Sequence, residues 1–135
     1  MTSVELAATV AAMLIAAVIG FQIALAAGLP LGTATMGGRA STTQGVLQPP
    51  FRVAALGSAL LLVLVAWVVL ARAGMLPHIL TGQSLAVGTW VVTAFLALNT
   101  LANLSGRHPL ERWGMASITL IAGLLVGYVA YAAPG

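Results

Sequence analysis

The stretch "VAALGSALLLVLVAWVVL", residues 53–70, decides the fold, because it is long, continuously apolar and without a charged side chain. A helix needs about 20 such residues to cross a bilayer. Three comparable runs occupy residues 4–27, 85–104 and 113–132. Because the runs do not alternate between apolar and polar residues, they favour helices over barrel strands. The sequence predicts an all-α integral membrane fold, a four-transmembrane-helix antiparallel bundle forming one domain over residues 1–135.

The composition indicates that most of the exterior faces lipid. Hydrophobic residues make up 61% of the chain and charged residues 5%, whereas a soluble domain has about 25% charged residues. The net charge of +3 is too small and too scattered to suggest binding of nucleic acid. Arginine without lysine, in a chain rich in alanine, glycine and valine, is typical of high-GC bacterial genomes. The chain has no cysteine, so it has neither disulfides nor thiolate ligands.

Basic residues predict which way the chain sits in the membrane. The connections after the first and third runs contain Arg39, Arg52, Arg107 and Arg112, and the other side of the membrane has only Arg72. Arginines near the ends of spans stay in the cytoplasm. We therefore expect a protein of the bacterial inner (cytoplasmic) membrane, with both termini outside and the polar loop 28–52 inside.

Several local signals predict the helix ends. Thr2 and Glu5 have the spacing of a capping box, and no basic residue precedes the first run. We therefore expect a retained span rather than a cleaved signal peptide. Ser105-Gly106 is predicted to end the third helix with a left-handed residue. Pro109 is predicted to open the fourth helix, with Glu111 in its first turn.

Small residues predict how the helices pack, because close packing replaces the hydrophobic drive between helices in lipid. Ala8, Ala12 and Ala16 lie four residues apart on the first helix. Gly123 and Gly127 have GxxxG spacing on the fourth. These residues form seams either inside one chain or between copies.

Polar residues gather near the predicted cytoplasmic side. In "LNTLANLSGRHPLER", residues 98–112, the polar face of a helix runs into a charged turn. A functional site here would hold an anion or a lipid headgroup, with arginines as ligands and amides orienting it. Otherwise the amides only bond one another, the arginines only set orientation, and Glu111 pairs with an arginine or caps a helix. The candidate site residues are Gln22, Arg39, Arg52, Asn99, Asn103, Arg107 and Arg112.

The distribution of ionisable residues disfavours an enzyme. Glu5 and Glu111 are predicted on opposite faces of the membrane, which removes paired-carboxylate chemistry. His78 and His108 are likewise separated, so no shared metal site or cofactor is expected. Gly37-Gly38-Arg39 lacks the phosphate-loop pattern.

The segments PLG (30–32), MGGR (36–39), PPFR (49–52) and LNTLANLSGRHPLER (98–112) resemble those of uncharacterised small four-span membrane proteins from high-GC bacteria. The resemblance covers most of the chain. It implies the four-span fold and no activity, so it assigns no functional residue.

Three functions are compatible with these features. The first is an accessory or structural membrane protein that acts through helix–helix contacts, as a homo-oligomer or within a larger membrane complex. The second is a small-solute channel or transporter built from an oligomer. The third is a subunit that binds anionic lipid or its headgroup.

The stretch "TATMGGRASTTQG", residues 33–45, is the most polar of the chain. Gly37-Gly38 can supply the positive φ angles of a two-residue hairpin turn. The flanks 33–36 and 39–42 are rich in threonine, which favours strands. We predict a short β-hairpin that lies against the helix ends as a lid over the polar residues. The alternative is a mobile linker of the same composition.

Overall fold

The computed structural model describes residues 1–135 and consists mainly of four long helices. These are α1 (Ser3–Ala27), α2 (Pro49–Arg72), α3 (Gly82–Leu104) and α4 (Ala116–Ala132), with a π-helical segment, Leu110–Met115, directly before α4. The segments Ser3–Ala27, Pro49–Arg72, Gly82–Leu104 and Leu110–Ala132 are each long and apolar enough to cross a membrane. The predicted set of four helices is therefore confirmed.

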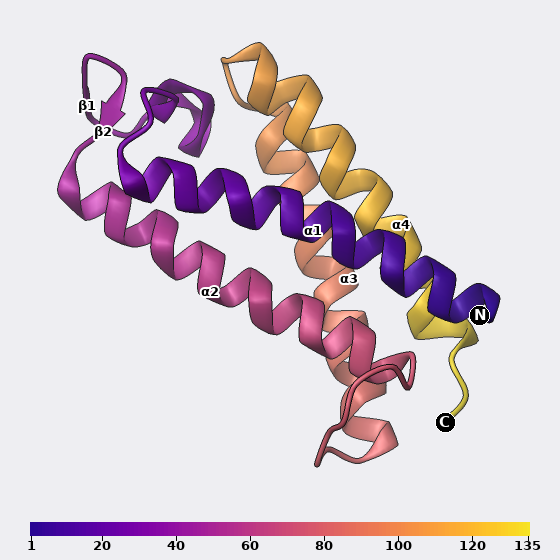
Figure 1. Cartoon of the computed structure of the whole chain (residues 1–135). Coiled ribbons are helices and arrows are strands. Elements are labelled where there is room, and N and C mark those ends of the chain that lie inside the picture. Colours follow the sequence, from indigo (N-terminus) through magenta and orange to yellow (C-terminus); the bar gives the residue numbers. More distant parts are fainter.

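The helices form two antiparallel pairs (Figure 1). α1 packs mainly against α2, and α3 packs mainly against α4. The pairs join chiefly through α1 and α4. Both termini and the α2–α3 loop lie at one end of the molecule, while the polar loop and the α3–α4 turn lie at the other (Figure 1).

The helix ends follow local signals with one exception. The capping box at the start of α1 is confirmed, since Glu5 N–H donates to Thr2 Oγ1 at 3.1 Å and Thr2 N–H donates to Glu5 Oε2 at 2.6 Å. The left-handed end predicted for α3 is wrong. Ser105 has φ −80° and Gly106 is not among the residues with positive φ, so no left-handed residue follows α3. The left-handed cap occurs instead at Gly28, after α1.

The main core lies between the helices toward the end that holds the termini. On α1 it includes Ala7, Ala8, Ala11 and Ile15. The predicted stripe of Ala8, Ala12 and Ala16 is not used as a whole inside the chain, because Ala16 is exposed; a seam between copies stays a prediction. A step of four residues drifts around a helix of 3.6 residues per turn, and the buried face follows alternating steps of three and four.

The small-residue seam on α4 is used inside the chain. A Cβ atom built at Gly123 would lie 3.4 Å from Leu96 Cβ, and one at Gly127 would lie 3.4 Å from Thr93 Cγ2. Both glycines therefore allow α4 to approach α3 closely. This arrangement matches the within-chain alternative for the GxxxG spacing.

A short hairpin is present, but at a different position from the one predicted. Strands β1 (Thr42–Thr43) and β2 (Val46–Leu47) pair antiparallel across Gln44-Gly45. Gln44 and Gly45 have φ values of 51° and 81°, as a two-residue hairpin turn requires. Gly37-Gly38 also have positive φ, at 68° and 72°, but they lie in a tight 3₁₀ turn, Met36–Gly38.

Burial of Leu47 explains the choice of register. Leu47 packs with Leu25 of α1 and Ala55 of α2 in a second small core. A hairpin centred on Gly37-Gly38 would pair Thr-rich flanks with little apolar surface to bury. The rest of the loop folds back on this hairpin, since Gly32 N–H donates to Gly45 O at 2.8 Å.

Replacing Gly123 by leucine should destabilise the protein by about 1–3 kcal/mol, the usual cost of overpacking a tight contact. The measurement is thermal unfolding of the purified protein in detergent. Gly57→Leu is the matched control, because Gly57 lies mid-helix on α2 with no atom within 4 Å of an added Cβ. Equal losses for the two variants would contradict the close α3–α4 approach at Gly123.

Candidate functional site

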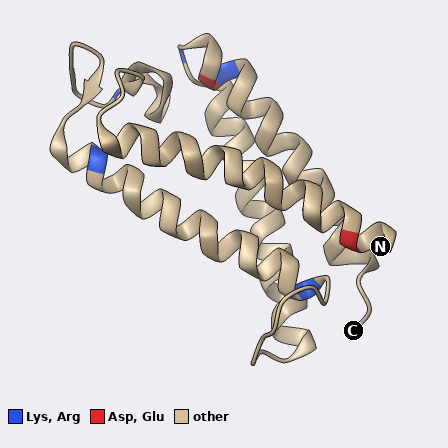
Figure 2. Ribbon diagram, in the orientation of Figure 1, with Lys and Arg blue, Asp and Glu red and all other residues tan.

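The charged residues of the chain gather at the two ends of the molecule (Figure 2). Glu111 begins the last helical segment, at the end that holds the polar loop. Glu5 lies in the first turn of α1, at the end that holds the termini. The two carboxylates therefore lie at opposite ends of the chain, as predicted.

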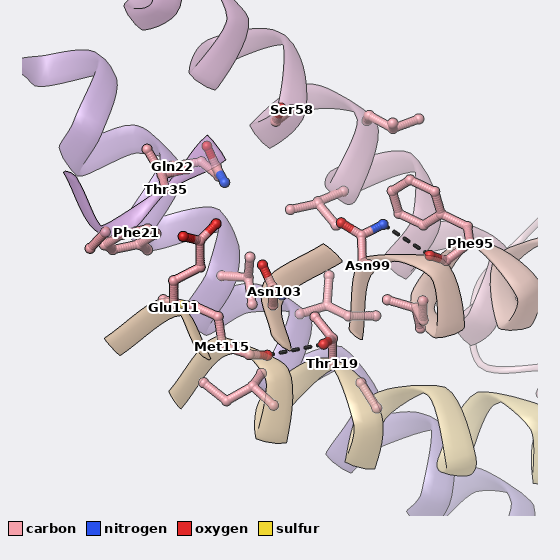
Figure 3. Close-up of a pocket in the computed structure, with 18 residues that line it drawn as sticks. Phe21, Gln22, Thr35, Ser58, Phe95, Asn99, Asn103, Glu111, Met115 and Thr119 are labelled. Carbon is pink, nitrogen blue, oxygen red and sulfur yellow. Dashed lines mark hydrogen bonds between the residues drawn. The ribbon is translucent and has the colours of Figure 1, made fainter. Parts of the chain in front are cut away.

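A cavity of about 210 Å³ lies between the helices below the polar loop. All four helices, the loop and the π-helical segment contribute to its wall (Figure 3). Its deep side is apolar and belongs to the main core, with Ile15, Leu62, Leu96 and Ala122. Its polar lining consists of Gln22, Thr35, Ser58, Asn99, Asn103, Glu111 and Thr119.

Glu111 is the only charged residue on this lining, and it is 4% exposed. Its Oε1 accepts a hydrogen bond from Gly37 N–H at 2.9 Å. Its Oε2 is buried and has no hydrogen-bond partner. Glu111 was expected to pair with an arginine or to cap a helix, and neither contact is among its hydrogen bonds. Its carboxylate instead connects the turn at Gly37 to the π-helical segment that lines the cavity.

Gly106 makes the buried position of Glu111 possible. A Cβ atom at Gly106 would collide with the Glu111 carboxylate and lie 2.6 Å from its Cδ. Gly106 is itself buried, so the carboxylate fills the place that a side chain would occupy. Glu111 also belongs to the π-helical segment, a rare geometry that recurs at functional sites.

The predicted amides are brought together in this cavity. Gln22 comes from α1, and Asn99 and Asn103 lie one turn apart on α3 (Figure 3). Asn99 Nδ2 donates to Phe95 O at 2.9 Å, which leaves its Oδ1 free. Gln22 Oε1 is buried without a partner. The amides make no hydrogen bond with one another, so they do not act as the interhelical contacts that the sequence also allowed.

The predicted arginines mostly lie elsewhere. Arg52 Nε donates to Ala26 O at 2.8 Å and so binds a free carbonyl at the C-terminal end of α1. Arg112 is exposed, with its guanidinium 5.2 Å from the centre of the Trp113 ring, as suits a cation–π contact. Arg107 is exposed in the α3–α4 turn. None of the three lines the cavity.

Arg39 lies at the mouth of the site. It lines an outer hollow of about 300 Å³ together with Met36, Gly37 and Ser105. The outer hollow adjoins the inner cavity, since Gln22, Thr35, Ser58, Asn99, Asn103 and Glu111 line both. A polar path therefore leads from the exposed loop to the inner cavity.

Sequence reasoning missed four polar residues of the lining, namely Glu111, Thr35, Ser58 and Thr119. Glu111 was assigned to the helix dipole, although Glu111, Met115, Thr119 and Ala122 recur at helical spacing on one face. That periodicity could have placed it inside. Ser58 is a single small polar residue within the apolar run 53–70, and Thr35 reaches the cavity through a loop whose path no local pattern predicts.

Glu111 is the only ionisable side chain of the inner lining. A comparison of the chain with protein-family models, curated proteins and solved structures finds no match.

Gly106→Ala should force the Glu111 carboxylate out of its place and destabilise the protein. In a double-mutant cycle with Glu111→Ala, which removes the collision, the coupling energy should be about 0.5–3 kcal/mol. Unfolding in detergent measures each variant. Gly20→Ala is the control, because an added Cβ there has no atom within 4 Å. Additive effects of Gly106→Ala and Glu111→Ala would rule out the arrangement.

Proposed function

We propose that this protein is an integral membrane protein that binds a small polar solute in the inner cavity, as a solute-binding protein of the channel or transporter class. One observation carries the proposal. Two oxygens, Glu111 Oε2 and Gln22 Oε1, are buried without a hydrogen-bond partner, and both belong to residues that line the cavity. Buried polar atoms are nearly always hydrogen-bonded, so a ligand or water must supply the missing donors.

The cavity opens at the loop end. The outer hollow leads to the loop surface at Arg39 and Ser105. On the opposite side the main core closes the cavity. Ile15, Leu62 and Leu96 belong to both the core and the cavity wall. This asymmetry fits a binding site that is open to one compartment, as in one state of an alternating-access transporter.

We further propose that the open end faces the cytoplasm of a bacterial cell, with both termini outside. Arg39, Arg52, Arg107 and Arg112 belong to the loop end, and Arg72 is the only arginine at the opposite end. Lipid is the expected neighbour of the outer helix faces, where large side chains such as Leu60, Leu101 and Leu124 are exposed.

Cysteine labelling tests the cavity and its orientation together, because the chain has no native cysteine. Ser58→Cys should react with a membrane-impermeant methanethiosulfonate in inverted vesicles and stay unlabelled in intact cells. Ser117→Cys should react from neither side. It is the matched control, since both hydroxyls donate to a backbone carbonyl four residues earlier, but Ser117 is exposed on the outer face of α4.

Each other outcome has a distinct meaning. Labelling of Ser58→Cys only from outside the cell would reverse the orientation. No labelling from either side would contradict a water-accessible cavity. A solute bound there should slow the labelling, and flux of that solute into liposomes, lost in Asn103→Leu, would identify a transporter.

A second candidate function is an accessory role through helix contacts. Ala16, Gly20 and Ala27 are exposed on α1, and Ala24 on the same face is half-buried. Small residues at spacings of four favour close approach of another helix. Nothing in the chain covers Gly20, because an added Cβ would meet no atom within 4 Å.

If this stripe binds a partner, the tagged chain should co-purify with that partner, or with a second copy, in stoichiometric amount in mild detergent. Gly20→Leu should abolish the association, while Gly57→Leu, the equivalent exposed glycine on α2, should leave it unchanged. An association that survives Gly20→Leu, or none at all, would count against this role.

A further inference from the structure

The unpartnered oxygen of Glu111 is the strongest chemical feature of the inner cavity. An isolated carboxylate is costly to bury unless a positive charge or several donors face it. Here the only hydrogen bond is the one from Gly37 N–H to Oε1, and Oε2 has none. The lining includes no lysine, arginine or histidine. The missing partner is therefore a donor, and a cation satisfies the carboxylate best.

The neighbouring polar groups also present acceptors. The Ser58 hydroxyl donates to Ala54 O at 3.0 Å, and the Thr119 hydroxyl donates to Met115 O at 3.0 Å. A hydroxyl has one proton, so the Ser58 oxygen keeps lone pairs, whereas Thr119 Oγ1 already accepts a hydrogen bond from Thr100 Oγ1 at 3.0 Å. Asn99 offers Oδ1, since one N–H of its Nδ2 is bonded to Phe95 O. A ligand with N–H donors can pair with the oxygens of Ser58 and Asn99 beside the Glu111 carboxylate.

The remaining wall indicates that the cation is organic. The lining has 18 residues, of which 11 are hydrophobic, and Phe21 and Phe95 add aromatic rings that attract cations. The volume of about 210 Å³ is below the roughly 300–1,000 Å³ of drug-sized pockets. A divalent metal ion prefers several carboxylate or carbonyl oxygens in a tight shell, and Glu111 is the only carboxylate here.

We infer that the solute is a small organic ammonium ion with an apolar body. This inference rests on the proposed solute-binding function and names its ligand class. The ammonium group pairs with the Glu111 carboxylate and donates to Asn99 Oδ1. The apolar body extends toward Ile15, Leu62 and Leu96 at the deep side. The charge of this ligand is opposite to that of the anion expected from the arginines.

Arg39 is the one competing cation in reach of the site. It is exposed and lines only the outer hollow. Its Nε would lie 3.7 Å from a Cβ atom built at Gly37, on the turn that bonds Glu111. An anionic ligand would have to bind Arg39 and stay away from the Glu111 carboxylate. Ligands of equal size and different charge therefore distinguish an anion site from a cation site.

The test uses three probes of equal size and different charge: hexylammonium, 1-hexanol and hexanoate. Binding to the purified full chain in lipid nanodiscs is measured by isothermal titration calorimetry, with empty nanodiscs to subtract partitioning into lipid. Hexylammonium should bind at least tenfold more tightly than 1-hexanol, and hexanoate should not bind. This comparison needs no variant, so it does not depend on how a substitution folds.

A matched pair of variants assigns the effect to Glu111. Glu111→Gln keeps an oxygen to accept the Gly37 N–H bond, and it should reduce hexylammonium affinity to that of 1-hexanol. Glu5→Gln alters the only other acid, at the opposite end, and should leave affinity unchanged. Equal losses in both variants would overturn the assignment.

Other results overturn the inference in distinguishable ways. Equal binding of hexylammonium and 1-hexanol would refute the cation and leave a solute-binding cavity. Hexanoate binding that is lost in Arg39→Gln would show an anion site. No binding of any probe would refute the amine class, while Ser58→Cys labelling decides separately whether the cavity is open to solutes.

Discussion

Backbone hydrogen bonding is the constraint on which this structure depends. In a chain with 61% hydrophobic residues, the helices cannot rely on water to satisfy their N–H and C=O groups, so each must satisfy its own. Of 101 backbone hydrogen bonds, 81 lie within helices and strands. Helices satisfied in this way can pack through small residues, as α3 and α4 do at Gly123 and Gly127. The polar side chains are then confined to the helix ends and to the space between helices.

The loop end shows how this confinement produces a site. The chain places polar side chains there from every helix, and the turn at Met36–Gly38 lies across them. The bond between Gly37 N–H and Glu111 Oε1 joins this turn to the last helical segment. Gly106, which has no side chain, leaves room for the carboxylate. One oxygen of Glu111 holds the turn, so the position of the loop and the proposed ligand binding depend on the same residue.

The proposed ligand follows from the single carboxylate of the lining, which no basic residue of the cavity accompanies. Protein backbone already receives the protons of Ser58 and Thr119 and one N–H of Asn99. What remains is the carboxylate, uncharged amide groups and two aromatic rings. The arginines, which suggested an anion, are engaged with a helix end, an indole ring or solvent. The residue types near the membrane surface therefore suggest an anionic ligand. The positions of the same side chains favour a cationic one.

The sequence by itself determined the four helices, the capping box at Thr2 and Glu5, and the gathering of Gln22, Asn99 and Asn103 at one end. These depend on hydrophobic length and helical periodicity, which are local properties. Only the tertiary structure decided the hairpin register, the buried face of α1 and the role of Glu111. The register depends on Leu47 packing against two helices, and the position of Glu111 depends on a turn 74 residues earlier in the chain. Such contacts join segments whose relative placement no local pattern encodes.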